Sequence, residues 1–142
     1  IVETDTHPGF MTDWQQPLAV VLTQADGRSI IHETVYESRF GYIEELNKMG
    51  AKIKLFEESP DLIKSKFGKR NYRQSAQLDG PTPLHGAEIT VPDLRAGFSY
   101  IVAALIADGV STIHKFSVLQ RGYEHLVAKL QSLEAEILEV KA

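Results

Sequence analysis

Apolar residues recur every three or four positions in two stretches of the first third of the chain, which predicts two amphipathic helices. The two stripes are Leu18, Val21, Leu22 and Ala25, and then Phe40, Ile43, Leu46 and Met49. Asp26-Gly27 and Gly50 follow them and supply glycines that end such helices. Short runs over residues 29–33 and 52–56 alternate with the helices and favour strands. The pattern therefore predicts the order helix, strand, helix, strand.

The last third of the chain predicts the same order. A helix is expected over 94–107 and a strand over 111–116. A second helix and a closing strand are then expected from the apolar stripe that ends at Leu133 and from residues 136–140. Apolar and polar residues alternate from His85 to Val91, which predicts a further strand before the first of these helices. Strands that alternate with helices indicate an α/β fold.

The first and the last third of the chain are copies of one unit. Three segments of the first copy recur 82 positions later, namely Ala25-Asp26-Gly27 as Ala107-Asp108-Gly109, Ile31-His32 as Ile113-His114, and Arg39 as Arg121. Repetition at a fixed offset is the signature of a duplicated structural unit. We therefore expect repeat one over about residues 1–56, a polar insertion over 57–83, and repeat two over about 84–142. Part of the insertion is expected to be a hairpin or mobile, and its end, 79–83, to be turn and not core.

Composition narrows the function classes. The 142 residues are 43% hydrophobic and 24% charged, which suits one globular domain with a core. A net charge of −4 argues against a nucleic-acid-binding surface, so the basic residues of 64–73 are expected to form a solvated loop. No apolar run approaches the roughly 20 residues of a membrane span, and no signal-like segment is present, so we expect a cytoplasmic protein. The first residue is Ile1 and not Met, which suggests a portion of a longer protein.

Several kinds of chemistry are excluded or disfavoured. The chain has no cysteine, which rules out disulfides, thiolate zinc sites and thiol catalysis within it. No two of its five histidines have the i, i+4 spacing of a helical metal site, so no metal is predicted. His32 and His114 occupy equivalent strand positions and are expected to be architectural. A glycine-rich phosphate loop of the Walker or Rossmann type is absent from the sequence.

Three arginines lie at or just before predicted helix starts: Arg39, Arg95 and Arg121. The helix dipole disfavours a cation there by roughly 0.3–1 kcal/mol, so the placement favours an anion close by. Helix amides and a guanidinium together can bind a phosphate or a carboxylate. The alternative is that each arginine pairs with an acid close to it in sequence, such as Glu37, Asp93 or Glu124. The equivalent placement of two arginines in both repeats favours the anion site.

Asp13 has two interpretations. Thr12-Asp13 precedes an apolar helical run, which is typical of an N-cap, and the residues alone favour that role. A carboxylate at such a corner can also take a proton from a substrate hydroxyl, provided that a substrate lies against it.

Four strings of the chain resemble, in order and context, the C-terminal part of UDP-N-acetylglucosamine enolpyruvyl transferases. The strings are His7-Pro8-Gly9-Phe10-Met11-Thr12-Asp13, Glu33-Thr34-Val35-Tyr36-Glu37-Ser38-Arg39-Phe40, Asp93-Leu94-Arg95-Ala96-Gly97 and Arg121-Gly122-Tyr123-Glu124. The resemblance covers the chain except 57–83. Enolpyruvylshikimate phosphate synthases share the repeat architecture, but their Lys-Glu-Ser-Asp-Arg motif is absent here, so they are the weaker match.

The resemblance implies an inside-out α/β barrel built from βαβαββ repeats, about two of which lie in this chain. It also implies transfer of the enolpyruvyl group from phosphoenolpyruvate to the 3-hydroxyl of UDP-N-acetylglucosamine, which begins peptidoglycan synthesis, and it implies no cofactor. The catalytic lysine and the loop cysteine of these enzymes belong to another, N-terminal domain, which nothing here matches. This chain alone is therefore expected to be inactive without that domain as its partner.

The resemblance also assigns roles to particular residues. Asp13 would bind the 3-hydroxyl and act as the base, while the Val35 backbone and the Tyr36 ring would lie along the nucleotide sugar. Arg95 and Arg121 would clamp phosphoenolpyruvate, with Arg39 as a possible further member of that site. Two alternatives stay open: a shikimate-like acceptor, or a catalytically silent module that keeps the nucleotide-sugar corner.

Overall fold

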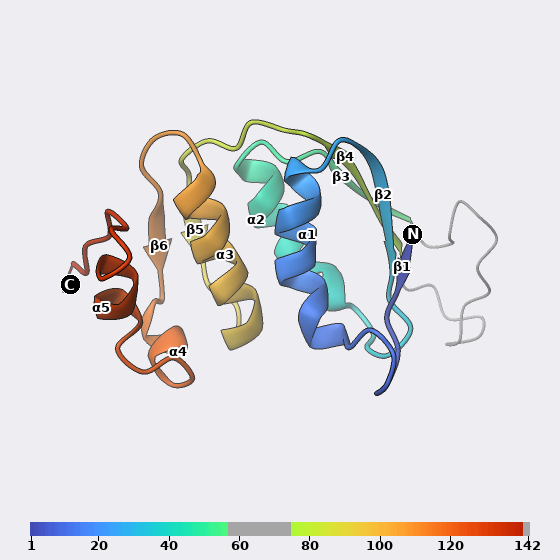
Figure 1. Ribbon diagram of the computed structural model, residues 1–142, viewed down its shortest axis with the longest axis horizontal. Helices are drawn as coiled ribbons and strands as arrows, with labels where there is room; N and C mark the ends of the chain where they lie inside the picture. The colour runs from blue at the N-terminus through green and yellow to red at the C-terminus, as the bar shows by residue number, and fades with distance from the viewer. Residues whose placement is uncertain (57–74, 141–142) are drawn as a thin grey trace.

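The computed structural model describes residues 1–56 and 75–140, and Figure 1 shows helices packed between a larger and a smaller group of strands. The first repeat contains β1 (Val2–Glu3), η1 (Thr12–Trp14), α1 (Gln15–Gln24), β2 (Gly27–His32), η2 (Arg39–Tyr42), α2 (Ile43–Lys48) and β3 (Ile53–Phe56), where η denotes a 3₁₀ helix. The rest of the chain contains β4 (Ser75–Gly80), β5 (Glu88–Thr90), α3 (Leu94–Ile106), β6 (Thr112–His114), α4 (Ser117–Gln120) and α5 (Leu126–Gln131). The α/β alternation predicted from the apolar pattern is confirmed.

The strands form two sheets. The larger has the order β1-β2-β4-β3, in which β1 is parallel to β2 and β4 is antiparallel to both of its neighbours. The smaller pairs β5 with β6 in parallel. Helix α1 packs between β4 and α3, so one core joins the two repeats. Its fully buried members come from both, for example Ile31, Leu46, Leu78, Ile89 and Ile101.

The register of the two parallel pairs supports the duplication. Ile31 of β2 pairs with Val2, and Ile113, 82 positions later in β6, pairs with Ile89. Gly27, the first residue of β2, and Gly109, shortly before β6, both have positive φ, 98° and 92°, a conformation that glycine adopts without strain. The same local signal therefore turns the chain from helix to strand in each copy.

Strand β4 corrects the interpretation of residues 57–83 as an insertion that ends in a turn. Its Ala76 and Leu78 are buried between β2 and β3, while the residues that alternate with them, Gln77 and Asp79, are only partly covered. Asp79 and Gly80 thus belong to a strand and not to a turn. β4 pairs in the antiparallel sense with β3, which lies before this stretch, so the pairing is not a hairpin within residues 57–83. Residues 57–74, with the basic loop expected there, lie outside the described residues.

The strand expected over residues 136–140 is absent, and Leu138 and Val140 are 87% and 88% exposed. The reason lies in how the first copy is paired. There β3 pairs with β4 and not with β2. In the described part of the second copy no strand corresponds to β4, so residues 136–140 have no partner.

A substitution in β4 tests its place in the core. Leu78→Ala is expected to lower the free energy of unfolding by about 2–5 kcal/mol, because it leaves a cavity at a side chain that is 1% exposed. Leu133→Ala is the matched control, since Leu133 is 78% exposed and should change stability by about 0.5 kcal/mol or less. Denaturant titration measures both. Equal effects of the two substitutions would show that residues 75–80 are not part of the core and belong to the polar insertion predicted from the sequence.

Candidate active site

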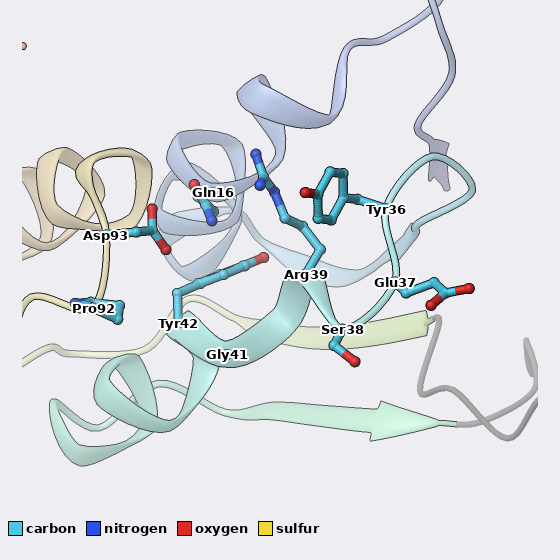
Figure 2. Close-up of a pocket in the computed structure, with 9 residues that line it drawn as sticks. All are labelled: Gln16, Tyr36, Glu37, Ser38, Arg39, Gly41, Tyr42, Pro92 and Asp93. Carbon is cyan, nitrogen blue, oxygen red and sulfur yellow. The ribbon is translucent and has the colours of Figure 1, made fainter.

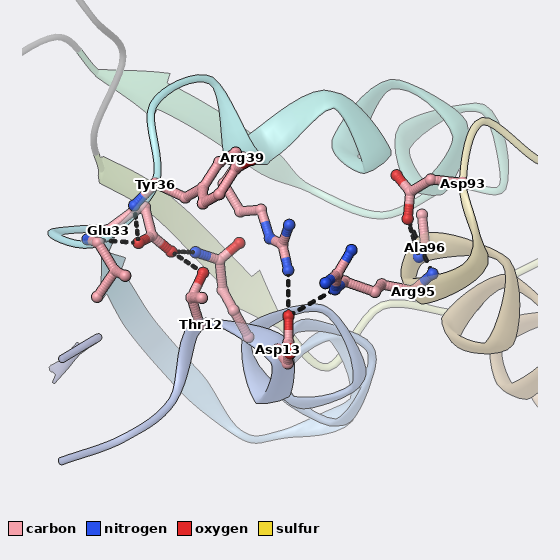
Figure 3. A network of polar contacts seen from close by, with 10 residues as sticks. Thr12, Asp13, Glu33, Tyr36, Arg39, Asp93, Arg95 and Ala96 are labelled. Atoms are coloured by element: carbon pink, nitrogen blue, oxygen red, sulfur yellow. Dashed lines mark hydrogen bonds and ion pairs between the residues drawn. The ribbon is translucent and has the colours of Figure 1, made fainter. Parts of the chain in front are cut away.

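Three residues predicted for the site meet at one point, although they come from both repeats. Asp13 lies in η1, Arg39 begins η2, and Arg95 lies in the first turn of α3. Oδ1 of Asp13 accepts from Nη2 of Arg39 at 2.6 Å and from Nε of Arg95 at 2.7 Å (Figure 3). The Asp13 carboxylate is about half exposed, as is Arg95, whereas the Arg39 side chain is largely buried. One accessible carboxylate is therefore held between two guanidinium groups.

Asp13 does not cap a helix, which corrects the role that its sequence context favoured. The N-cap positions of η1 and α1 are Met11 and Trp14, and neither makes a side-chain capping bond. The equivalent acid of the second repeat does cap: Oδ1 of Asp93 accepts from the backbone N–H of Arg95 and of Ala96 at 2.8 and 3.0 Å. The Asp13 side chain is thus not needed to start its helix.

The guanidinium groups of Arg39 and Arg95 do not form their ion pairs with the acids close to them in the sequence, Glu37 and Asp93. Both guanidinium groups bond to Asp13, and Asp93 bonds to the backbone of Arg95 instead of its side chain. The guanidinium of Arg39 also lies over the ring of Tyr36, 5.3 Å from its centroid, in a cation–π contact. A partner twenty or more residues away therefore decides how each arginine is oriented.

Arg121 is the C-cap residue of α4 and does not begin a helix, which corrects the expected placement. It is exposed, and no other described residue forms an ion pair or side-chain hydrogen bond with it. The two residues after Arg121 pack against α3. Gly122 lies so close to Leu94 that a Cβ there would be 2.6 Å from Leu94 Cδ2, and the ring of Tyr123 stacks on that of Phe98, with 5.0 Å between the ring centroids. Figure 1 shows α4 at the same edge of the molecule as the starts of α1 and α3. Arg121 therefore lies beside the start of α3, the helix that carries Arg95.

Glu33 is a site residue that the sequence reasoning missed. Its Oε1 accepts from the backbone N–H groups of Val35 and Tyr36 at 2.7 and 2.8 Å. Its Oε2 accepts from the hydroxyl of Thr12 at 2.7 Å and from the side-chain amide of Gln15. The side chain thus binds the loop of Val35 and Tyr36 to the turn that carries Asp13 (Figure 3). The only sequence signal was an acid as the last residue of the strand predicted over residues 29–33, and the observed strand β2 ends one residue earlier, at His32.

A hollow of about 250 Å³ lies between η2 and the start of α3, beside the group formed by Asp13, Arg39 and Arg95, called the Asp13 cluster below (Figure 2). It is lined by Gln16, Tyr36, Glu37, Ser38, Arg39, Gly41, Tyr42, Pro92 and Asp93. Gln16 Oε1 and the Tyr42 hydroxyl are buried and find no hydrogen-bond partner among the described residues. Burial, with a further contribution from the charge of Glu33, raises the pKa of the Tyr42 hydroxyl above its ordinary value. Tyr42 therefore stays a neutral donor at physiological pH.

The histidines take structural positions. His32 is buried at the end of β2, and its Nδ1 lies 2.8 Å from the hydroxyl of Ser75 in β4. His114 ends β6 at the equivalent position and lies 3.8 Å from Glu88.

Within residues 1–56 and 75–140, no three His, Asp or Glu side chains gather in a way that could hold a metal ion. None of the helices in these ranges is long and apolar enough to cross a membrane.

The arrangement suits chemistry between an alcohol and an anion. No described residue bonds to Oδ2 of Asp13, and the side chain is about half exposed, so this oxygen can accept a proton from a hydroxyl. Arg39 and Arg95 place two guanidinium groups on the one carboxylate of Asp13, and Arg121 follows α4, which packs against α3. Preorganised guanidinium groups can bind a small anion.

Comparisons with known proteins agree with this chemistry. The family model described as EPSP synthase (3-phosphoshikimate 1-carboxyvinyltransferase) matches residues 1–130. The chain is 53% identical over 136 residues to a UDP-N-acetylglucosamine 1-carboxyvinyltransferase of Protochlamydia amoebophila, covering 96% of this chain and 29% of that protein. It is 51% identical over 142 residues to one of Chlamydia muridarum, covering 99% and 32% respectively. The chain thus spans about a third of the length of the curated relatives it matches.

Solved structures give the same result. The enolpyruvyl transferase NikO from Streptomyces tendae superposes with a TM-score of 0.80 at 31% identity, over 99% of this chain and 29% of that one. An EPSP synthase from Acinetobacter baumannii has a TM-score of 0.52 at 17% identity over 71% of this chain, which indicates a shared fold alone. On the family match and these likenesses, the chain belongs to the EPSP synthase (3-phosphoshikimate 1-carboxyvinyltransferase) family of enolpyruvyl transferases.

Proposed function

We propose that this chain is part of a UDP-N-acetylglucosamine 1-carboxyvinyltransferase. The whole enzyme transfers the enolpyruvyl group of phosphoenolpyruvate to the 3-hydroxyl of UDP-N-acetylglucosamine, as the first committed step of peptidoglycan synthesis in the cytoplasm. The observation that carries the proposal is the convergence of Asp13, Arg39 and Arg95 in a chain 53% identical to a relative of that name.

The proposed reaction is an addition followed by an elimination. Asp13 takes the proton of the 3-hydroxyl through Oδ2 as the sugar oxygen forms a bond to C2 of phosphoenolpyruvate. C3 of phosphoenolpyruvate takes a proton from a general acid outside this chain. The tetrahedral adduct then loses a proton from C3, and the bond from C2 to the phosphate oxygen breaks. Enolpyruvyl-UDP-N-acetylglucosamine and phosphate are the products.

The arginines have separate tasks in this mechanism. Arg95 and Arg121 bind the carboxylate and phosphate of phosphoenolpyruvate, whose charge changes as phosphate leaves. Arg39 is largely buried and bonded to Asp13, so its main task is to orient that carboxylate. Arg95 also bonds to Asp13, which brings the acceptor's base next to the donor's anion.

The loop after β2 faces the nucleotide sugar in this proposal. Glu33 occupies the backbone N–H of Val35, so the Val35 carbonyl is the backbone group left to contact the sugar. The ring of Tyr36 is 60% exposed and lies under the Arg39 guanidinium, which suits a flat surface against a ligand.

The proposed architecture is the inside-out α/β barrel of βαβαββ repeats. The order β1, α1, β2, α2, β3, β4 supports it, because it matches one such unit, and β5, α3 and β6 begin a second. Repeat one, the segment 57–83 and repeat two then form a C-terminal portion of the enzyme. An N-terminal domain supplies the catalytic lysine and the general acid, so this chain alone is inactive.

Acceptor choice tests the proposal in the full-length protein. Phosphate release from phosphoenolpyruvate is expected with UDP-N-acetylglucosamine and not with shikimate 3-phosphate. Release with shikimate 3-phosphate alone would support the other acceptor. Binding of UDP-N-acetylglucosamine by calorimetry without phosphate release would support a silent binding module, and neither binding nor release would overturn the proposal.

A further inference from the structure

Glu33 is a buried acid whose two oxygens serve two separate parts of the site. The residue is 1% exposed, and no described lysine or arginine pairs with it. Oε1 receives two backbone N–H groups, and Oε2 receives the Thr12 hydroxyl and the Gln15 amide. Four donors on two oxygens match a carboxylate in its ionised form, which only accepts hydrogen bonds.

The two parts are the ones assigned to the acceptor. Thr12 directly precedes Asp13, the proposed base, and Gln15 begins α1. Val35 and Tyr36 are the proposed contacts of the nucleotide sugar. A single carboxyl group therefore sets the spacing between the group that takes the proton and the loop that holds the sugar.

We propose that Glu33 is a positioning residue for the acceptor, which holds Asp13 and the loop of Val35 and Tyr36 at the spacing that the nucleotide sugar requires. This inference rests on the proposed function. Neither Arg95 nor Arg121 bonds to Glu33, so the effect of removing Glu33 falls on the acceptor and not on phosphoenolpyruvate.

Glu33→Ala in the full-length enzyme tests the proposal. It is expected to raise KM for UDP-N-acetylglucosamine at least ten-fold and to lower kcat, because both parts of the acceptor site lose their anchor. KM for phosphoenolpyruvate should stay within about two-fold of the parent value. Hydrogen exchange at the backbone amides of Val35 and Tyr36 should become at least ten-fold faster, since each loses its acceptor.

Glu33→Gln is the conservative comparison. Its amide oxygen can still accept from the two backbone N–H groups, while its NH₂ group faces Thr12 and Gln15. Both of those can adapt, because a hydroxyl can rotate to accept and the Oε1 atom of Gln15 has no partner and can flip into place. This variant should recover most of the affinity for the nucleotide sugar and most of the amide protection.

A matched pair of threonine variants covers the case in which Glu33→Ala does not fold. Thr12→Val removes the hydroxyl that anchors the turn before Asp13, and should lower kcat several-fold. Thr23→Val removes a hydroxyl that donates to the Val20 carbonyl near the other end of α1, and should leave kcat at the parent value.

Three results would overturn the proposal. The first is an equal rise in KM for both substrates in Glu33→Ala. The second is a lowered melting temperature with unchanged kinetics per folded molecule. The third, in the threonine pair, is the same effect at both positions. Failure of the proposed function is a different result, because the parent enzyme would then not release phosphate, while amide exchange would still report whether Glu33 holds the loop.

Discussion

Asp13→Asn is expected to lower the turnover of the full-length enzyme by about 10²–10⁴-fold, the range that a lost general base produces. The amide cannot take the proton of the acceptor hydroxyl at neutral pH. Its Oδ1 can still accept from Arg39 and Arg95, so the arginines keep a partner. The fold should persist, because Asp13 does not cap α1, the largely buried Arg39 keeps an acceptor in Oδ1 of the amide, and an ion pair as exposed as that with Arg95 contributes about 0–1 kcal/mol.

The measurement is phosphate release under saturating substrates, with the melting temperature as a check on folding. Asp79→Asn is the matched control, because Asp79 also forms an exposed ion pair with an arginine, Arg28 at 2.7 Å, outside the Asp13 cluster. It should change neither turnover nor stability appreciably. Unchanged turnover in Asp13→Asn would leave Asp13 as an orienting partner of the arginines and remove it as the base.

The longer helices and most strands could be predicted from the sequence because their signals are local, whereas the short helix α4 was not predicted. Apolar spacing places α1 and α3, and the glycines at 27 and 109 place the turns after them. The errors came where pairing is not local. β4 follows a polar stretch and itself carries Gln77 and Asp79, so its place inside the sheet depends on pairing with β2 and β3. Residues 136–140 have the composition of a strand, but a strand also needs a partner.

In the candidate site, too, local sequence context was informative about single residues, whereas contacts between residues far apart in the sequence could not be predicted. The positions of Asp13 and the arginines at predicted helix starts singled them out, and the resemblance assigned their roles. The structure brings Asp13, Arg39 and Arg95 together. Sequence context alone favoured a cap for Asp13, because a local bond to the helix is the simplest use of an acid there. The ion pairs that it forms instead join it to Arg39, 26 residues later, and to Arg95 in the second repeat. Glu33 escaped notice because two of its four partners lie about twenty residues before it.

Arg121→Ala is expected to weaken the binding of phosphoenolpyruvate by about 10- to 100-fold. The proposed clamp loses a guanidinium whose hydrogen bonds to an anion contribute about 1.5–3 kcal/mol, and each 1.4 kcal/mol is ten-fold in affinity. Stability should change by about 0.5 kcal/mol or less, because Arg121 is exposed and makes no ion pair with another described residue. A cation kept at this edge without an internal partner is available to a ligand.

The comparison of the two substrates decides the role of Arg121. KM for UDP-N-acetylglucosamine should stay within about two-fold, since the acceptor's contacts come from the turn of Asp13 and the loop after β2. Arg121→Lys keeps the charge but not the planar fork that matches a carboxylate or phosphate, so it should recover only part of the affinity. Arg28→Ala removes an exposed arginine outside the Asp13 cluster and controls for net charge. Equal losses for both substrates would place Arg121 outside the phosphoenolpyruvate clamp, as a residue that supports the edge of the site as a whole.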